Sequence, residues 1–443
     1  MKVLVVGGGA REHAICKAVA RSKDAELYCA MKNLNPGIVR LAKNHLLTNE
    51  TDVSKIVDYA KKKSICLAII GPESAEEAGI VDELKKAGIP AASPTKGAAL
   101  IETDKEFMRK LMKKHKISGR LGAESFSDPA KAREFIEKND LNVAIKPLGL
   151  TGGKGVRVGG DHFTDIEGAM GYVNEVLSNS IGGKSKVLIE EKAAGEEFTI
   201  QAFSDGKTTL PMPSVQDHKR LLPGDNGPNT GGMGSYSQAD GLLPFMSKSD
   251  YEEAATIIQT IVESLADEGT PYVGTIYGQF MLTTNGPKVI EINARFGDPE
   301  AMNVLSLLET DYIEICKAMV EGTLHEKNVS FKKQATVCKY VVPEGYGVKS
   351  MEDVLIEVDE KAVADAGAEI FYASVNERGG QIYTTSSRAL AVVGVADTID
   401  EAEVICEKGL ANVKSEHIFI RHDIGGKELI QKRINNINSL RGN

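Results

Sequence analysis

The stretch GPKVIEINARFGDPE, residues 286–300, carries the most specific chemical pattern of the chain. In an extended strand, Glu291 and Asn293 point to one face, while Ile290 and Ile292 point into the core. Two oxygen ligands on one strand suit magnesium, which accepts few protein ligands and completes its octahedron with water and phosphate oxygens. The pattern therefore indicates a metal site, although a half-buried hairpin with a polar outer face has the same pattern.

The preceding strand offers a further oxygen ligand, and the connecting turn decides whether it can take part. A two-residue turn at 285–286 sets Gln279 opposite Ile292, on the wrong face. A three-residue loop at 284–286 sets Gln279 opposite Glu291 instead. We expect the three-residue loop, and the expected metal ligands are then Gln279, Glu291 and Asn293.

A second informative stretch is IKPLGLTGGKG, residues 145–155, in which a glycine-rich loop follows a short apolar run. The spacing excludes a Walker P-loop, because Leu148 stands where a glycine is needed and Gly155 where Ser or Thr is needed. Two interpretations remain. Either the loop is flexible and closes its backbone N–H groups and Lys154 over a polyphosphate, or it is a hairpin turn with an exposed lysine.

The bulk properties of the chain exclude several classes of protein. A length of 443 residues suggests about three domains at roughly 150 residues each. The net charge is −9, without a basic tract carrying interleaved aromatics, which argues against a nucleic-acid partner. The six cysteines form no C-x-x-C pair, so we expect buried thiols in a reducing cytoplasm. The chain shows neither a signal sequence nor a long apolar span, and we expect no membrane association.

The periodicity of the chain changes along its length. Over residues 1–100, apolar runs alternate with amphipathic segments, which predicts a parallel sheet with helices on its faces. A helix follows from Thr103, with an expected capping box between Thr103 and Glu106. Strands are expected at 143–146, 186–191, 197–203, 208–215 and 277–282, and from about 330 the pattern is that of an α+β domain. The fold class expected is thus α/β and α+β.

Several motifs occur in a fixed order along the whole chain. They are GGGAREHA (7–14), GPE (71–73), SPTKGAALIETDKEF (93–107), IEEKAAGEEFTI (189–200), QDHKRLLPGDNGPNTGGMGSYS (216–237) and VIEINARFGDPE (289–300). This set resembles the glycinamide ribonucleotide synthetase family of the ATP-grasp superfamily. The resemblance implies an ATP-grasp fold with an N-terminal Rossmann-like parallel-sheet domain and a C-terminal α+β domain. The limits expected are 1–102, 103–192 for the small subdomain, 193–328 for the large subdomain with the metal site, and 329–443.

The resemblance also implies a reaction: ATP, glycine and 5-phosphoribosylamine give glycinamide ribonucleotide, ADP and phosphate, the second step of purine biosynthesis. The implied cofactor is Mg²⁺ or Mn²⁺, with ATP as co-substrate. The partners are small molecules, and we expect a monomer or weak dimer without nucleic-acid or membrane partners. The alternatives are another ATP-grasp carboxylate–amine or carboxylate–thiol ligase, and a nucleotide-binding regulator without turnover.

By the same resemblance, particular residues would hold the nucleotide. Lys105 and Lys146 would reach the phosphates, and Lys154 would lie at the tip of a loop that closes over them. Glu190 would receive the adenine amino group, and Glu197 the ribose hydroxyls, since carboxylates accept from an amine and a diol. The complete implied ATP-binding set is Lys105, Lys146, Gly152, Gly153, Lys154, Gly155, Glu190, Lys192, Ala193 and Glu197.

The amino-terminal glycine loop opens a helix after a strand, as in a dinucleotide fold. The third glycine of G-x-G-x-x-G is replaced by Glu12, and the second strand ends without an acid for a ribose, which argues against hydride transfer. A helix N-terminus still binds a single phosphate well. We therefore expect the sugar phosphate here, beside Arg11. The segment MKNLNPGI (31–38) departs from the family's usual loop, and Asn35 with its neighbours would take over in shifted register.

The chemistry requires a carboxylate to be activated by phosphoryl transfer, which needs positioning and charge neutralisation. Arg295 would bind the glycine carboxylate or an oxyanion, and Asp217 would hold the glycine ammonium. Lys219 and Arg220 would contact phosphate groups. No role is assigned to Arg388, because TTSSRAL (384–390) lacks the glycines that the family carries before this arginine. The catalytic candidates are Arg295 and Lys154. The substrate-binding candidates are Gly7, Gly9, Arg11, Glu73, Asp217, Lys219, Arg220, Gly231, Gly232, Arg295 and Asp298.

Overall fold

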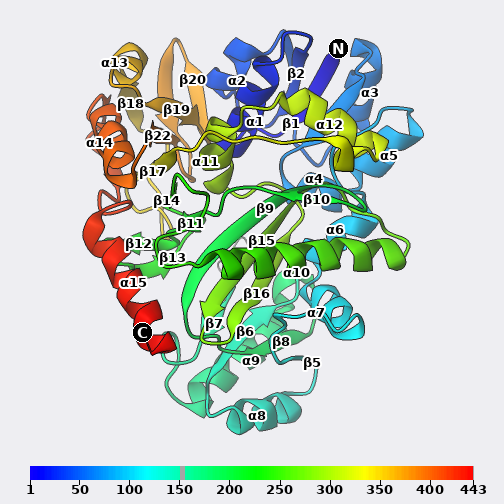
Figure 1. Cartoon of the computed structure of the whole chain (residues 1–443), viewed down its shortest axis with the longest axis vertical. Helices are drawn as coiled ribbons and strands as arrows, with labels where there is room; N and C mark the ends of the chain where they lie inside the picture. The colour runs from blue at the N-terminus through cyan, green and yellow to red at the C-terminus, as the bar shows by residue number, and fades with distance from the viewer. Residues whose placement is uncertain (150–154, 443) are drawn as a thin grey trace.

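A computed structural model describes residues 1–149 and 155–442 of the chain. The N-terminal domain is a parallel sheet in the order β3-β2-β1-β4 with helices on its faces, which confirms the alternation predicted from the sequence (Figure 1). The apolar residues of β1, β2 and β4 are buried on both faces, as expected when helices cover a parallel sheet, whereas Leu47 of the edge strand β3 is exposed. The elements are β1 (Lys2–Val6), α1 (Ala10–Ala20), β2 (Glu26–Met31), α2 (Pro36–Leu41), β3 (Asn44–Leu47), α3 (Val53–Lys63), β4 (Leu67–Ile70), α4 (Glu73–Glu77) and α5 (Ile80–Lys86).

The central part of the chain forms two antiparallel sheets. The larger, β10-β9-β15-β16, has the helix α10 (Lys248–Asp267) across one face, and the smaller, β5-β8-β6-β7, is covered by α8 and α9 (Figure 1). The larger contains β9 (Glu196–Asp205), β10 (Thr209–Pro211), β15 (Val273–Thr283) and β16 (Gly286–Asn293). The smaller contains β5 (Ala123–Phe126), α8 (Pro129–Lys138), β6 (Val143–Pro147), β7 (Arg157–Val158), α9 (Ile166–Asn179) and β8 (Val187–Glu191).

Two helices connect the N-terminal domain to the smaller sheet, and their junction differs from the prediction. Thr103 ends α6 (Lys96–Thr103), and α7 (Lys105–Lys114) begins directly after Asp104. The Asp104 carboxylate accepts from the backbone N–H groups of Glu106 and Phe107, at 3.0 and 3.1 Å. The predicted Thr103 capping box is therefore wrong. Because Asp104 is extended between two helices, its short carboxylate caps the second one instead.

The C-terminal domain is built on the sheet β11-β14-β17-β22-β19, with α14 packed against it. Its first strands come from the middle of the chain, so the segment 216–237 joins the C-terminal domain to the large sheet. The elements are β11 (Gln216–Asp217), β12 (Arg220–Leu222), β13 (Asn226–Asn229), β14 (Gly234–Ser237), α11 (Glu300–Leu307), α12 (Tyr312–Glu321), β17 (Ala335–Pro343), β18 (Leu355–Val358), α13 (Glu360–Asp365), β19 (Glu369–Tyr372), β20 (Val375–Arg378), β21 (Gln381–Thr384), β22 (Leu390–Ala396), α14 (Ile399–Leu410), β23 (Val413–Lys414) and β24 (Ile418–Ile420).

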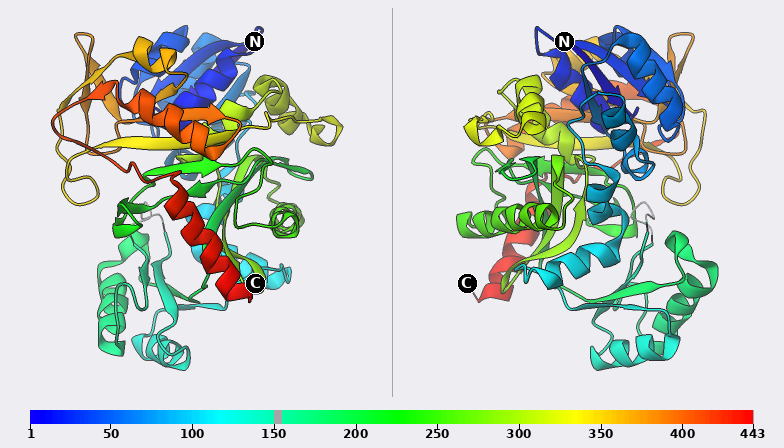
Figure 2. Two further views of the ribbon diagram at one scale, coloured as in Figure 1. Left: turned by 60° about the vertical axis from the view of Figure 1, so that its left-hand side comes forward. Right: turned by 90° about the vertical axis from the view of Figure 1, so that its right-hand side faces the viewer.

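The last helix, α15 (Lys427–Arg441), leaves the C-terminal domain and runs beside the large sheet (Figure 2). Arg441 at its end pairs with Asp250 of α10 at 2.8 Å and donates to the Thr283 carbonyl at the end of β15. No helix of the described residues is both long and apolar enough to cross a membrane. The six cysteines are free thiols, as predicted, but only five are buried as expected, because Cys66 is exposed.

Candidate active site

The predicted metal strand pair forms, but by a different route. Gln279 of β15 faces Glu291 of β16, as predicted. The turn itself is shorter than predicted: Thr283 pairs with Gly286, and this two-residue turn alone would set Gln279 opposite Ile290. A β-bulge at Ile290 shifts the register by one residue. The predicted three-residue loop is therefore wrong, and the bulge supplies the missing residue, since bulges re-aim the side chains that follow them.

The carbonyl groups that the bulge turns out of the ladder are held by cations from other elements. Arg109 of α7 donates to the carbonyls of Val289 and Ile290, each at 2.9 Å. Lys146 of β6 also donates to Ile290, at 3.3 Å. Because buried carbonyl groups need hydrogen-bond partners, these contacts stabilise the bulge and fix β16 against the smaller sheet.

The three predicted metal ligands share one face of the hairpin with Glu197. Asn293 donates to Glu291 at 3.3 Å, and Gln279 donates to Glu197 at 2.6 Å. Lys219 donates to the side-chain oxygen of Gln279 at 2.6 Å. The ligand atoms predicted to bind the metal are all oxygens, and only one of the three ligands is a carboxylate. Such a set fits a hard divalent ion that is bound mostly by water and phosphate. Accordingly, no cluster of three or more His, Cys, Asp or Glu residues that could hold a metal occurs in the described ranges.

Three lysines from different elements surround Glu291. Burial raises the pKa of the Glu291 carboxyl, but Lys219, Lys146 and Lys105 outweigh it, and the pKa lies below its usual value. Lys105 begins α7 and donates to the Gly149 carbonyl at 2.9 Å; burial lowers the pKa of its ammonium group. The structure thus brings together the predicted phosphate-binding lysines and the predicted metal strand.

Glu190 of β8 is almost completely buried, and its partners are two cationic side chains, whereas the prediction gave it the adenine amino group. Arg109 approaches both its carboxylate oxygens, at 2.6 and 2.9 Å, and Lys146 lies 2.7 Å away. Burial raises the pKa of Glu190, but these two cations bring it down to about 2. Its carboxylate is therefore a counter-ion for Lys146 and Arg109, which leaves the adenine role without support. Sequence analysis missed Arg109, although it lies one helical turn after Lys105 on the same face of α7.

The remaining nucleotide candidates lie around β8 and the glycine loop. Lys192 and Ala193 follow β8 directly, and the Lys192 N–H donates to the Asn142 carbonyl at 2.8 Å, so a nucleotide contact here would use the carbonyl of Lys192. The Gly155 carbonyl accepts from Tyr172 of α9 at 2.7 Å. The predicted contacts of Gly152, Gly153 and Lys154 lie outside the described residues.

The segment 216–232 carries the predicted ligands of the glycine substrate. One carboxylate oxygen of Asp217 is buried without a hydrogen-bond partner among the described residues, and burial raises the pKa of this group, with Glu300 nearby. Burial lowers the pKa of Lys219, but Glu197 and other acids raise it to about 12. Arg220 turns to the Gly227 carbonyl and to Asp161 at 3.2 Å, so its predicted phosphate contact finds no support here.

A residue without a predicted role, Arg388, reaches this segment from the C-terminal domain. Its guanidinium pairs with Asp298 at 2.9 Å and donates to the carbonyls of Gly231 and Gly232. It also lies over the Tyr340 ring, with its central carbon 4.4 Å from the ring centre. The predicted candidates Gly231, Gly232 and Asp298 are thus brought together by an arginine that is far away in the sequence. Nothing in the local motif TTSSRAL indicates these contacts of Arg388.

The predicted Arg295 and Glu73 meet at the border of the N-terminal domain. Arg295 pairs with Glu102 at 3.0 Å and with Glu73 at 3.4 Å, and Arg11 lies 3.8 Å from Glu73. Burial raises the pKa of Glu102 to about 7. Glu76 is buried as well, and neither of its carboxylate oxygens has a partner among the described residues. Acidic groups that the sequence analysis did not single out therefore surround these arginines.

The phosphate site predicted at the amino-terminal glycine loop is already occupied by a side chain. Glu12 accepts from the Gly9 N–H at 2.7 Å, and it pairs with Arg11 at 2.7 Å. A Cβ atom at Gly7 would lie 2.5 Å from the Glu12 side chain. The glycines thus make room for a carboxylate at the start of α1, and a phosphate here would meet an anion. The structure therefore gives no support for phosphate binding by Gly7 and Gly9, which stays a prediction.

Asn35, predicted to contact the sugar phosphate, is also engaged inside the protein. Its side-chain oxygen caps α2 by accepting from Gly37 and Ile38, and its amide group donates to the carbonyls of Gly8 and Tyr372. The departure of MKNLNPGI from the family's loop thus serves to pack the N-terminal domain against the C-terminal domain.

Comparisons with known proteins agree with this architecture. Models of phosphoribosylglycinamide synthetase match in three parts: the N domain at residues 1–102, the ATP-grasp (A) domain at 103–301 and the C domain at 336–427. The phosphoribosylamine–glycine ligase of Methanothermobacter thermautotrophicus is 53% identical over 441 residues, covering 100% of both chains. That of Methanocaldococcus jannaschii is 50% identical over 445 residues, again with 100% of both chains covered.

Solved structures show the same fold. The crystal structure of phosphoribosylamine–glycine ligase from Thermotoga maritima superimposes with a TM-score of 0.81 at 27% identity, covering 96% of this chain and 100% of that one. A biotin carboxylase domain from Hydrogenobacter thermophilus, crystallised with MgADP, gives a TM-score of 0.73 at 14% identity over 100% of this chain and 95% of that one. The second likeness concerns the fold alone.

Proposed function

Because the chain belongs to the phosphoribosylglycinamide synthetase family, we propose that it joins glycine to 5-phosphoribosylamine. It is an ATP-grasp ligase of the ADP-forming type, and ATP-grasp enzymes use ATP and divalent metal ions. The products are glycinamide ribonucleotide, ADP and phosphate, in the second step of purine biosynthesis.

The observation that carries the proposal is the group of three lysines around Glu291. One carboxylate balances the charge of one lysine and does not account for Lys105, Lys146 and Lys219 together. A triphosphate with its metal ion needs such a surplus of positive charge. The oxygen atoms of Gln279, Glu291 and Asn293 would hold the ion, which we propose to be Mg²⁺, with Mn²⁺ as the alternative. When bound, the ion neutralises phosphate charge.

The reaction begins with in-line transfer of the γ-phosphoryl group to the glycine carboxylate, which gives glycyl phosphate. The amine of 5-phosphoribosylamine then attacks the activated carbonyl carbon, and phosphate leaves. Lys105 and Lys146 neutralise the transferred group, and no protein nucleophile is needed. We assign the ribose hydroxyls to Glu197, which already lies against Gln279. The role of Lys154 over the phosphates stays a prediction.

On the substrate side, the unpartnered oxygen of Asp217 is suited to the glycine ammonium group, with Glu300 beside it. Arg295 would bind the glycine carboxylate or the developing oxyanion, and Glu73 and Arg11 would line the same region. Arg388 and Asp298 hold the Gly231–Gly232 backbone that borders this site.

The proposal is tested by measuring ADP release with glycine while the amine acceptor is varied. We expect ADP formation that requires both glycine and 5-phosphoribosylamine. Equal ADP formation without 5-phosphoribosylamine would instead indicate a ligase with another substrate pair. Nucleotide binding without turnover under any of these conditions would indicate a regulator, although the complete set of lysines and metal ligands argues against it.

Three further predictions concern the whole protein. The domain limits at 102/103, 192/193 and 328/329 stay predictions. We propose that the protein acts in the cytoplasm as a monomer or weak dimer. Size-exclusion chromatography coupled to light scattering checks the oligomeric state, and a stable higher oligomer would contradict it.

A further inference from the structure

The C-terminal helix α15 reaches the candidate active site through one arginine. Arg433 projects from this helix and donates to Glu196 at 2.8 Å and also to Asp225. These two carboxylates belong to different segments: Glu196 begins β9, and Asp225 lies in the turn between β12 and β13. One guanidinium group therefore joins the large sheet to the segment 216–232.

The first carboxylate lies directly beside a nucleotide candidate. In a strand, successive side chains point to opposite faces, so Glu196 and Glu197 face different sides of β9. Glu196 is buried towards α15, where Asn436 also donates to it at 2.5 Å. Glu197 faces Gln279 and Lys219. Fixing Glu196 therefore fixes the direction in which Glu197 points.

The second carboxylate acts on the substrate segment through His218. Asp225 contacts the His218 ring nitrogen at 3.3 Å, and Arg421 at 3.0 Å. His218 lies between Asp217 and Lys219 in the sequence, and its backbone pairs with Gly234 and Met233. Its ring is buried away from the site, so the residues on either side of it point in the opposite direction.

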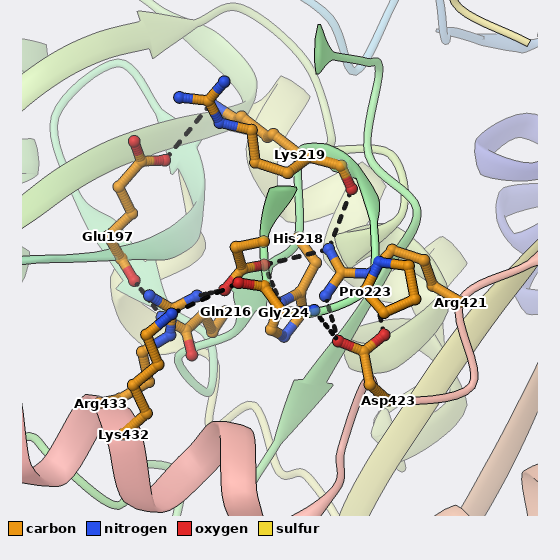
Figure 3. A network of polar contacts seen from close by, with 12 residues as sticks. Glu197, Gln216, His218, Lys219, Pro223, Gly224, Arg421, Asp423, Lys432 and Arg433 are labelled. Atoms are coloured by element: carbon orange, nitrogen blue, oxygen red, sulfur yellow. Dashed lines mark hydrogen bonds and ion pairs between the residues drawn. The ribbon is translucent and has the colours of Figure 1, made fainter. Parts of the chain in front are cut away.

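Figure 3 shows the same arrangement in space: Arg433 and Lys432 rise from α15, Arg421 and Asp423 lie beside His218, and the Lys219 and Glu197 side chains lie farther from the helix. Asp423 pairs with Arg421 at 2.6 Å and accepts from the Gly224 N–H at 2.9 Å, which holds the same turn from its other side. Each of the two carboxylates held by Arg433 is thus one or two contacts away from a candidate ligand.

We propose that Arg433 is a positioning residue that fixes the nucleotide strand and the substrate segment relative to each other. It touches neither substrate nor nucleotide. It acts through Glu196 on Glu197, and through Asp225 and His218 on Asp217 and Lys219. In-line phosphoryl transfer depends on the relative position of nucleotide and acceptor, and small displacements reduce the rate strongly. The identity of the acceptor, glycine, rests on the proposed function.

The experiment compares Arg433→Met with a matched control, Arg441→Met. Arg441 lies on the same helix and makes a comparable pair with Asp250, at 2.8 and 2.9 Å, away from the candidate ligands. Four quantities are measured for each variant: the Tm, the Kd for MgADP by calorimetry, and the kcat and the glycine KM from ADP release. Arg433→Lys, which keeps the charge but loses the two-armed geometry, serves as a conservative variant.

We expect Arg433→Met to raise the glycine KM about tenfold and to weaken MgADP binding several-fold, since both sides of the site lose their fixed position. The glycine KM and the Kd for MgADP of Arg433→Lys should lie between those of Arg433→Met and the wild type. Arg441→Met should lower the Tm by a comparable amount. Its glycine KM and its Kd for MgADP should both stay within about twofold of the wild type. Equal kinetic effects of Arg433→Met and Arg441→Met would show a merely structural role and overturn the proposal.

Two isosteric variants test the contacts of Arg433 with Glu196 and Asp225 separately. They also replace Arg433→Met in the experiment if that variant does not fold. Glu196→Gln should act mainly on MgADP affinity, and Asp225→Asn mainly on the glycine KM. The absence of this split would also overturn the proposal. Failure of the proposed function is distinguishable, because MgADP binding needs no turnover. A wild-type protein that binds MgADP but releases no ADP with glycine and 5-phosphoribosylamine together contradicts the function, and the Arg433 test then proceeds on the Kd for MgADP and the Tm.

Discussion

Two buried glutamates of the candidate active site differ in their charge state. Glu190 in β8 has a pKa lowered to about 2, whereas Glu102 in α6 has a pKa raised to about 7. Burial raises the pKa of both carboxyl groups, and each pairs with an arginine, Arg109 or Arg295. The difference comes from the other neighbours. Glu190 also has Lys146 as a partner, while Glu102 lies near another acid, Glu73.

This contrast divides the site into a cation-rich half and an acid-rich half. In the cation-rich half, Lys105, Lys146 and Lys219 surround Glu291. In the acid-rich half, carboxylates outnumber the arginines Arg11 and Arg295, and Glu76 is left without a partner among the described residues. A surplus of positive charge suits a triphosphate, whereas a group of carboxyl oxygens, which accept hydrogen bonds whether or not they are ionised, suits an amine. The two halves thus match the two kinds of group that the proposed reaction brings together.

The strongest way to break this contrast is to remove the carboxylate at the centre of the cation-rich half. Glu291→Ala deletes the charged metal ligand and should lower kcat/KM in the ADP-release assay by about a thousandfold or more, since metal charge stabilisation is worth several kcal/mol. Lys288→Ala, on the same strand, is the control and should retain activity. Full activity of Glu291→Ala would mean that the lysines gather for a reason other than a metal-bound phosphate.

The second test compares stability across the smaller sheet. Glu190→Gln leaves Arg109 and Lys146 without their buried counter-charge, and removing one partner of a buried pair costs about 4 kcal/mol of unfolding free energy. The measurement is urea unfolding at pH 7, with Glu191→Gln, the exposed neighbour, as control. Because the folded-state pKa is depressed, this stabilisation is present above about pH 4.5 and is lost as the pH falls towards 2. A loss as small as that of the control would contradict the counter-ion role.

Sequence reasoning predicted the fold correctly, because the fold follows from periodicity and from the order of motifs. It also singled out Lys105, Lys146 and Lys219, which the structure brings near Glu291. The pairing of Gln279 with Glu291 was predicted correctly for an incorrect reason. Nothing near residue 290 indicates a bulge, since its carbonyl partners, Arg109 and Lys146, come from elements far away in the sequence. A local pattern can therefore indicate which side chains must meet without indicating the backbone path.

The acid-rich half shows where local patterns fail. A glycine loop before a helix looks the same in sequence whether it holds a ligand phosphate or a side chain, and here Glu12 fills it. The contacts of Arg388 and Arg433 join residues separated by ninety positions or more, which no spacing rule connects. Such contacts depend on how the domains pack, and a single sequence does not reveal them.

The third test uses the opposite sign of the pKa shift in the acid-rich half. Because the folded-state pKa of Glu102 is raised from 4.5 to about 7, the folded protein retains this proton while the unfolded chain has lost it, and stability falls as the pH rises between these values. The expected loss attributable to Glu102 is about 3 kcal/mol. Glu102→Gln should remove this part of the slope in urea unfolding at pH 5 and pH 8. An unchanged slope would show that Glu102 is ionised throughout, like Glu190.

The smallest effect is expected where an ion pair is exposed to solvent. Arg40 of α2 pairs with Glu360 of α13 at 2.6 Å, but about half of the Arg40 side chain is exposed. Exposed pairs gain little, because water screens the charges and ordering the side chains costs entropy. Arg40→Gln should therefore change the unfolding free energy by less than about 0.5 kcal/mol at pH 7. A loss of unfolding free energy as large as that of Glu190→Gln would mean that burial does not distinguish the Arg40–Glu360 pair from the Arg109–Glu190 pair. The contrast between Glu190 and Glu102 would then need a cause other than their buried neighbours.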